Sequence, residues 1–131
     1  MALLRAVGSA IPDHDYAKLA SYAPAIGEKI HIVGHVKGLY WSYIEGVVSG
    51  YRLEVPAAKV EAHMSGPFMQ LSAPVYFGNS GGGVFNSDGD LVGVVSFMLG
   101  APLTNFAIPV KRIRALVKEA REMDLKIKKN Q

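Results

Sequence analysis

A short glycine-rich segment around one serine is the part of this sequence best suited to chemistry. Residues 77–83 read Phe-Gly-Asn-Ser-Gly-Gly-Gly, so glycines stand on both sides of Ser80. Because glycine adopts backbone angles that other residues avoid, such a loop can expose the hydroxyl while nearby N–H groups turn toward one point. An N–H donor aimed at the oxyanion of an acyl-transfer intermediate can be worth roughly 3–4 kcal/mol of barrier. Taken alone, the segment is a weak signal: an incidental serine in a glycine-rich loop is the favoured interpretation, and nucleophilic catalysis by Ser80 is the alternative.

A serine nucleophile also needs a general base within hydrogen-bond reach, itself oriented by a carboxylate. The candidate bases are the histidines of the chain: His14, His31, His35 and His63. His14 is flanked by two aspartates, but no pattern places it or the others beside Ser80. We therefore expect surface or structural histidines, with a self-contained hydrolase as the least favoured alternative. No two of them have a ligand spacing on one element, so we expect no metal and no cofactor.

The elements that must position this loop are mostly short strands. Segments rich in β-branched and aromatic residues predict strands over residues 30–33, 41–48, 68–75, 82–85, 91–97 and 105–110. Residues 86–89, Asn-Ser-Asp-Gly, are typical of a hairpin turn, and Pro74 limits the end of the third segment to an edge or a turn. About six strands with frequent turns indicate a small all-β barrel or sandwich.

The hydrophobic period changes after Pro109, a residue suited to a first helical turn. Apolar residues then recur every three or four positions: Val110, Ile113, Leu116, Val117, Ala120 and Met123. This spacing predicts an amphipathic helix with one stripe against the barrel and the charged face in water. We expect one domain: an approach segment over 1–27, the β-barrel over 28–108, a closing helix over 109–125 and a basic tail over 126–131.

Composition excludes several classes of protein. With 131 residues, 50% of them apolar and 19% charged, the chain can bury one core and is not a disordered polymer. The net charge of +3 comes from basic residues mixed with acidic ones near the end, so we expect no nucleic-acid binding. No signal peptide or apolar run of ~20 residues is recognisable, so we expect no membrane span. The absence of cysteine slightly favours a reducing compartment such as the cytoplasm.

The loop and the hairpin after it resemble those of the trypsin-like serine peptidases, most closely the HtrA or DegP type. The matching residues are Gly-Asn-Ser-Gly-Gly at 78–82, Val-Phe-Asn at 84–86 and Gly-Asp-Leu-Val-Gly-Val at 89–94. Further blocks match the family in the same order along the chain: residues 2–7, 27–34 with 44–50, and 106–110. The resemblance covers nearly the whole chain. It implies a single six-stranded antiparallel Greek-key barrel, one half of the trypsin-like fold, followed by a C-terminal α-helix.

The resemblance also implies roles for individual residues. Ser80 would be the acyl-accepting nucleophile, and the backbone N–H groups of Gly78 and Ser80 would form the oxyanion hole. The bound peptide would pair with Ser96, Phe97 and Met98, and its side chain would enter a pocket walled by Val75, Tyr76, Phe77 and Asn105. No acidic residue is among them, so small or medium apolar side chains fit better than Lys or Arg. Ordinary core packing is the alternative for Tyr76, Phe97 and Met98.

The sequence departs from the family pattern in several places. Ser72 stands where HtrA-type relatives usually have Asp, Gly83 replaces a Pro, and Asn105 replaces a Gly at the pocket wall. In the family, the triad His and Asp come from a first barrel, which has no counterpart in these 131 residues. We therefore expect both groups to be supplied from outside this chain.

Three hypotheses follow. The favoured one is the nucleophile-bearing barrel of a serine endopeptidase, acting on a peptide or protein substrate. The second is a catalytically inactive single-barrel remnant that serves as a binding or structural module, and the third is the self-contained hydrolase. A barrel without its partner exposes an apolar face, so we expect a complementary N-terminal barrel or a second copy of the chain as partner.

Overall fold

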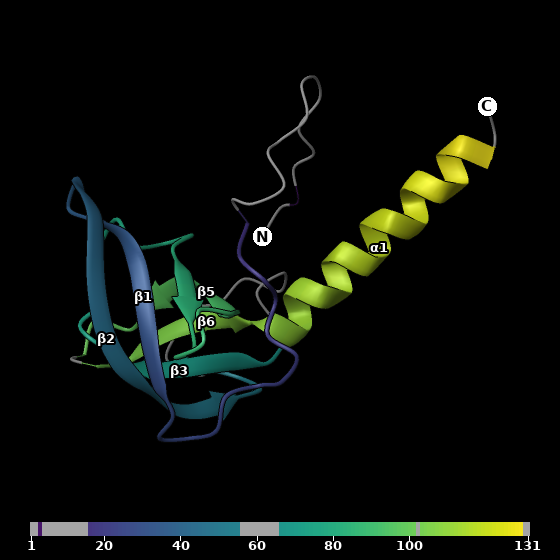
Figure 1. Ribbon diagram of the computed structural model, residues 1–131. Coiled ribbons are helices and arrows are strands. Elements are labelled where there is room, and N and C mark those ends of the chain that lie inside the picture. Colours follow the sequence, from purple (N-terminus) through teal and green to yellow (C-terminus); the bar gives the residue numbers. More distant parts are fainter. Residues whose placement is uncertain (1–2, 4–15, 56–65, 102, 130–131) are drawn as a thin grey trace.

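The computed structural model describes residues 3, 16–55, 66–101 and 103–129 (Figure 1). These residues form six strands and one helix: β1 (Lys29–Val36), β2 (Leu39–Arg52), β3 (Phe68–Ser72), β4 (Gly83–Phe85), β5 (Leu91–Met98), β6 (Asn105–Pro109) and α1 (Val110–Lys129). All six predicted strands are present, and the third ends at Ser72, before Pro74. In the described part of the chain, no helix has the length and apolar character needed to cross a membrane.

The strands close into an antiparallel barrel in the order β1-β2-β3-β6-β5-β4, which confirms the predicted six-stranded barrel with a C-terminal helix. Strands that follow one another in sequence pair with each other, except β3 and β4. The predicted turn between β4 and β5 is fixed by Asn86, whose Oδ1 accepts hydrogen bonds from Asp88 N and Asp90 N. After β3 the chain does not turn back beside it, because β3 pairs with β6. It crosses instead to β4 through residues 73–82. The loop that contains Ser80 is therefore the crossover of the barrel.

The barrel interior is filled by apolar side chains that alternate along the strands, as the two-residue period of a strand requires. On β1, Ile30 and Ile32 are fully buried while Lys29 is exposed. Burial of such a side chain stabilises the fold by about 1.5–3 kcal/mol. A second cluster at one end of the barrel contains Phe68 and Phe106, with Phe97 packed against them. The crossover begins at β3 and ends at β4, so both of its ends are fixed to the packed barrel.

α1 contacts the barrel only with its first turns. Val110 and Ile113 are buried, and Figure 1 shows the rest of the helix projecting away from the barrel. The Arg114 guanidinium donates hydrogen bonds to the carbonyls of Leu19 and Ala20, which ties the helix to the approach segment. The expected contact of the whole apolar stripe with the barrel is therefore wrong.

The helix also ends later than predicted. It continues to Lys129, so most of the segment predicted as a basic tail over 126–131 is helical. Neither glycine nor proline occurs between 110 and 129 to stop it. Lysine has a high helix propensity and interacts favourably with the negative end of the helix dipole, so the basic residues extend the helix.

Candidate active site

The crossover loop presents Ser80 at its tip. Gly78 (φ 100°) and Gly81 (φ 88°) lie on either side of it in a left-handed conformation that glycine alone adopts without strain. Two tight turns follow one another, because Asn79 N donates to Tyr76 O (3.2 Å) and Gly82 N donates to Asn79 O (2.9 Å). As a result Asn79 points inward and is fully buried, whereas Ser80 is exposed.

Hydrogen bonds from two strands hold the loop in place. On the β5 side, Gly81 N donates to Val95 O (2.8 Å) and Val95 N donates to Gly82 O (2.9 Å). On the β1 side, Lys37 N donates to Phe77 O (3.0 Å). A Cβ atom on Gly78 would overlap the carbonyl oxygen of His35, so the loop packs against the β1–β2 turn without room for any side chain there. Glycine at position 78 is therefore required by both conformation and space.

The backbone N–H groups of the loop differ in whether they donate to a carbonyl oxygen. Asn79, Gly81 and Gly82 donate theirs to carbonyl oxygens. Within the part of the chain that the structure describes, the N–H groups of Gly78 and Ser80 donate to no backbone carbonyl. These are the two groups predicted to form an oxyanion hole.

The Ser80 hydroxyl donates a hydrogen bond to the backbone carbonyl of Ser96, at 3.2 Å. Ser96 lies at an irregularity of β5, where the register against β6 shifts between Val95 and Phe97. Such a bulge re-aims the backbone and places the Ser96 carbonyl beside the loop. A carbonyl oxygen does not remove a proton at neutral pH, so this contact orients Ser80 without activating it.

An apolar pocket of about 570 Å³ lies on the β5 side of Ser80. Its lining includes six of the residues predicted to bind substrate: Val75, Tyr76, Phe77, Ser96, Phe97 and Met98. Ser80, Val95 and Gly100 complete the lining. None of the described residues that line the pocket is charged. Val95 and Gly100 were not predicted, because their place in the wall follows from the β5 bulge and the turn after β5.

Two predicted pocket residues have a structural role as well. Phe97 stacks on Phe106 at 4.9 Å between ring centroids and meets Phe68 edge-on at 5.2 Å, so its ring also belongs to the core. Asn105 is buried, and its Nδ2 donates to Ala73 O at 2.6 Å. It lines a smaller neighbouring cavity of about 250 Å³ rather than the main pocket. Asn105 therefore holds the start of the crossover that forms the pocket wall.

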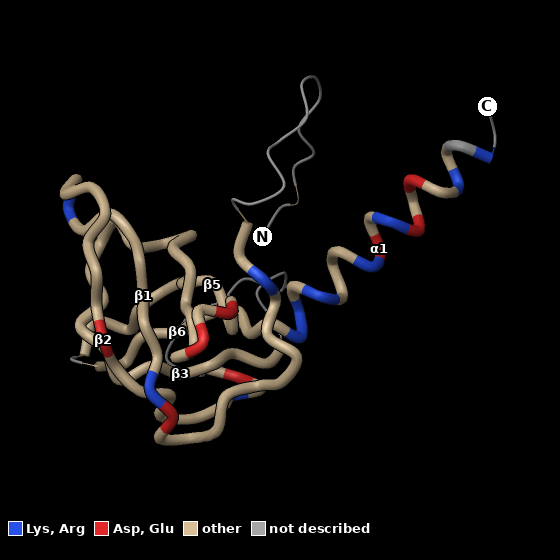
Figure 2. The backbone as a smooth tube through the Cα atoms, in the orientation of Figure 1, with Lys and Arg blue, Asp and Glu red and all other residues tan. Residues whose placement is uncertain are grey.

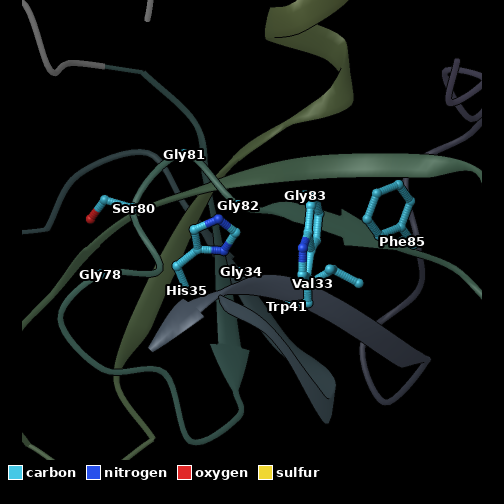
Figure 3. A pocket seen from close by; sticks show the side chains of 10 residues that line it. All are labelled: Val33, Gly34, His35, Trp41, Gly78, Ser80, Gly81, Gly82, Gly83 and Phe85. Carbon is cyan, nitrogen blue, oxygen red and sulfur yellow. The ribbon is translucent and has the colours of Figure 1, made fainter. Parts of the chain in front are cut away.

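A second pocket, of about 440 Å³, lies on the β1 side of Ser80. The glycines of the loop form one wall, and Val33, His35 and Trp41 line the opposite side (Figure 3). The His35 ring contacts the Trp41 ring edge-on, at 5.3 Å between centroids. Figure 3 shows the Ser80 hydroxyl pointing away from His35. Trp41 and His35 were not predicted as parts of the site, because a turn places them there through packing that no motif encodes.

The other histidines do not join Ser80. His31 lies on the outer face of the β1–β2 hairpin, where its Nδ1 is 2.5 Å from the Tyr43 hydroxyl. His14 and His63 lie outside the described residues. Among the histidines that the structure describes, His35 alone lines a pocket with Ser80. In the same described ranges, no group of three or more His, Asp or Glu side chains could hold a metal ion.

A polar network fastens the hairpin that carries the second pocket. The Tyr43 hydroxyl donates to Glu45 at 2.7 Å, and the Lys29 ammonium lies 3.0 Å from the same carboxylate oxygen. These hydrogen bonds lower the pKa of Glu45, and the contact with the carboxylate raises the pKa of Tyr43. The network is exposed and lies away from Ser80, so it supports the hairpin rather than the chemistry.

Asn79 is the unusual polar residue of the site. Its side-chain oxygen and nitrogen are both buried, with no hydrogen-bond partner among the described residues. A Cβ atom on Gly34 would overlap the side-chain oxygen Oδ1 of Asn79, so Gly34 makes room for this side chain against β1. The sequence could not predict this pairing of residues that are distant along the chain.

Comparisons with known proteins agree with this geometry. A family model described as trypsin-like peptidase domain matches residues 1–94. The "Serine protease HtrA-like" of Staphylococcus aureus (strain MRSA252) is 36% identical over 102 residues, which cover 72% of this chain and 13% of that protein. Its counterpart in Staphylococcus epidermidis is 35% identical over 104 residues, covering 72% of this chain and 17% of that protein. The chain thus spans a small part of the curated relatives that it matches.

Solved structures show the same fold. The serine endoprotease from Yersinia pestis matches with a TM-score of 0.64 and 21% identity, over 82% of this chain and 36% of that one. An HtrA-type protease, AlgW, with a decapeptide matches with a TM-score of 0.71 and 20% identity, over 86% of this chain and 34% of that one. Because the family model covers most of the sequence, the chain belongs to the trypsin-like peptidase family, with its sequence similarity on the HtrA-like side of that family.

Proposed function

We propose that this chain is the nucleophile-bearing barrel of an HtrA-like serine endopeptidase and that Ser80 forms the acyl-enzyme. The observation that carries the proposal is the position of Ser80. Ser80 is exposed and lines the apolar pocket. The backbone N–H groups of Gly78 and Ser80 belong to the same loop and donate to no backbone carbonyl among the described residues. The triad His and Asp come from a complementary barrel outside these residues.

In this mechanism the Ser80 hydroxyl rotates away from Ser96 and attacks the carbonyl carbon of the scissile peptide bond. The His of the complementary barrel takes the hydroxyl proton, and the negative charge forms on the carbonyl oxygen. The N–H groups of Gly78 and Ser80 stabilise that oxyanion. When the C–N bond breaks, the His gives the proton to the leaving amine. Water then hydrolyses the acyl ester and restores the hydroxyl.

The substrate backbone binds along the free edge of β5. β4 is short, and its pairing with β5 extends only to Val94. Beyond Val94, Val95 bonds to the loop, Ser96 is the bulge residue, and Phe97 and Met98 pair with β6. Among the described residues, no strand pairs with the other edge of β5 over Ser96–Met98. An extended peptide can add itself to such an edge through main-chain hydrogen bonds. The apolar pocket beside Ser80 then receives a small or medium apolar side chain.

The complementary barrel docks on the β1 side, over the pocket that contains His35 and Trp41. Tyr40 and Trp41 at the hairpin turn are 77% and 78% exposed, and Phe77 beside the loop is also 78% exposed. Exposed aromatic residues gathered in one place mark an interaction surface. A partner there faces Ser80 from the side opposite the substrate pocket.

A second candidate function is an inactive peptide-binding module. It is favoured by the contact of the Ser80 hydroxyl with the Ser96 carbonyl, a group that does not act as a base. The open edge of β5 and the apolar pocket do not depend on a triad, so peptide binding survives without catalysis.

The test is cleavage of an unfolded protein such as β-casein. The chain is assayed alone and with the separately expressed His- and Asp-bearing barrel of an HtrA-like relative. Trp41 is the single tryptophan of this chain, so with a tryptophan-free partner barrel a change in its fluorescence reports docking independently of cleavage. Ser80→Ala is the matched inactive control.

We expect cleavage by the mixture and none by the Ser80→Ala mixture. Docking without cleavage contradicts the peptidase and supports the binding module. Cleavage by the chain alone that is lost in His35→Ala contradicts the external base and supports a self-contained hydrolase.

A further inference from the structure

The outer half of α1 carries an apolar stripe that the barrel does not cover. The stripe begins at the contact with the barrel, where Ile113 is buried. It continues along the projecting part of the helix, where Met123 is 65% and Ile127 59% exposed (Figure 1). A solvent-exposed helix of this kind gains nothing from apolar residues on one face unless another surface packs there.

The spacing of the stripe identifies the kind of surface that fits. Its residues are Ile113, Leu116, Ala120, Met123 and Ile127, which are separated by three, four, three and four positions. This alternation averages 3.5 residues and is the spacing with which one helix packs along another in a coiled coil. Only the first turns of α1 contact the barrel, and that contact does not require the stripe to continue to Ile127. We therefore infer that the surface that packs on the outer half of the stripe is a second helix.

The charges beside the stripe fit α1 of a second copy that runs antiparallel. Figure 2 shows acidic and basic residues interspersed along α1. Glu119 and Lys126 are exposed, and their spacing of seven residues places them on the same edge of the stripe. If Ala120 lies opposite Met123 of the second copy, the antiparallel register brings Glu119 of each copy next to Lys126 of the other, and both contacts lie on the same flank of the seam. In a parallel pair, Glu119 would instead face Asp124 of the other copy, which brings like charges together. Flanking charges of this kind set the orientation of paired helices.

We propose that two copies of this chain associate through an antiparallel pair of α1 helices, over residues 116–127. Leu116 then packs on Ile127 of the second copy, and Ala120 packs on Met123. At 1.5 Å per residue, the two helix starts lie about 35 Å apart, so the barrels sit at opposite ends and both Ser80 loops stay open. The association is independent of the proposed peptidase function. With about two heptads in the seam, it is weak and concentration-dependent.

Sedimentation velocity of the full chain over a concentration series tests this proposal. Glu119→Lys and Lys126→Glu each bring like charges together in the antiparallel pair, and we expect each to weaken dimerisation at least tenfold. An equimolar mixture of the two variants pairs opposite charges again and regains the dimer. Arg121→Glu reverses a charge outside the seam and is the matched control, with dimerisation unchanged.

A second pair of variants tests the apolar contact. Met123→Glu places a charge in the seam, and we expect a monomer at concentrations where the wild type dimerises. Leu125 is 60% exposed but lies outside the seam, so Leu125→Glu is the matched control and keeps the dimer. Circular dichroism of each variant checks that the helix is retained.

Several results would overturn the proposal. A wild-type chain that stays monomeric at every concentration shows that the stripe binds something other than a second copy. Stronger dimerisation of Glu119→Lys shows a parallel pair, in which the introduced ammonium group would meet Asp124 of the other copy. A dimer that is lost in Trp41→Ala but kept in Met123→Glu shows association through the barrel face instead.

Discussion

The two sides of Ser80 are built differently. On the β5 side, the pocket is walled by strand and crossover residues that also belong to the core, such as Val75 and Phe97. On the β1 side, the pocket is walled by glycine backbone and by His35 and Trp41 at an exposed turn. The barrel therefore forms the walls of the β5-side pocket by itself, whereas the walls of the β1-side pocket include side chains at an exposed turn.

In the function proposed above, this difference gives the two sides separate tasks. The proposed substrate site is on the β5 side, where the shape of the pocket depends on contacts within the barrel. The proposed docking surface is on the β1 side, where the exposed aromatic residues have little protein packed on them and the Ser80 hydroxyl points away from His35. Changes on the β5 side should therefore alter selectivity, and changes on the β1 side should alter docking.

The largest expected effect breaks the loop that separates the two sides. Gly78→Ala places a side chain at a positive φ and against the His35 carbonyl, whereas Gly81→Ala has the same φ problem but open space. The conformation costs both variants about 1–2 kcal/mol, and the overlap costs Gly78→Ala about 1–3 kcal/mol more. Urea unfolding measures the two values. Equal destabilisation of the two variants would show that the loop does not pack against the β1–β2 turn as described.

Docking on the β1 side should depend on Trp41. Trp41→Ala removes a large exposed ring from that surface, and buried tryptophans at interfaces commonly contribute about 2 kcal/mol or more. We expect the variant to bind the complementary barrel at least about tenfold more weakly, with Ser80→Ala as a control that binds normally. Titration calorimetry gives both affinities. Unchanged binding by Trp41→Ala would move the docking surface elsewhere.

Selectivity should depend on the β5 side. Met98→Asp adds a carboxylate to the apolar pocket, and Met98→Asn changes its size and polarity in the same way without the charge. We expect the preference for Lys over Val before the scissile bond to rise about tenfold in Met98→Asp relative to Met98→Asn, because pocket contacts are worth about 1–3 kcal/mol. Competition between two such peptides in the cleavage assay measures the ratio. The same ratio in both variants would contradict the pocket assignment.

The smallest effect concerns the network that fastens the β1–β2 hairpin. The pKa of Glu45 is lowered by the hydrogen bond from Tyr43 and by Lys29. A carboxyl whose pKa is lower in the folded protein stabilises the fold above its unfolded pKa, and this contribution is lost as the pH falls through the folded pKa. Glu45→Gln should therefore be slightly less stable than the wild type at neutral pH. Urea unfolding should show the difference shrink at acidic pH, and a pH-independent difference would contradict the network.

Local sequence signals predicted most of this structure. Runs such as Ile30–Val33 alternate β-branched residues, and the turn at 86–89 has its own composition, so the strands and the hairpin follow from local rules. The glycines around Ser80 likewise predict an exposed serine. The sequence did not predict that the helix continues to Lys129, because no glycine or proline after residue 125 marks where a helix ends. The β5 bulge and the fit of Asn79 against Gly34 depend on strands that are distant in sequence, so no local pattern encodes them.

Covalent labelling shows directly whether Ser80 is the nucleophile. The chain is treated with a fluorophosphonate, alone and with the complementary barrel, and the adduct is located by peptide mass spectrometry. We expect an adduct on Ser80 that forms much faster in the mixture and is absent from Ser80→Ala. An unlabelled Ser80 in a mixture whose Trp41 fluorescence reports docking, or an adduct at a different serine, would contradict this assignment.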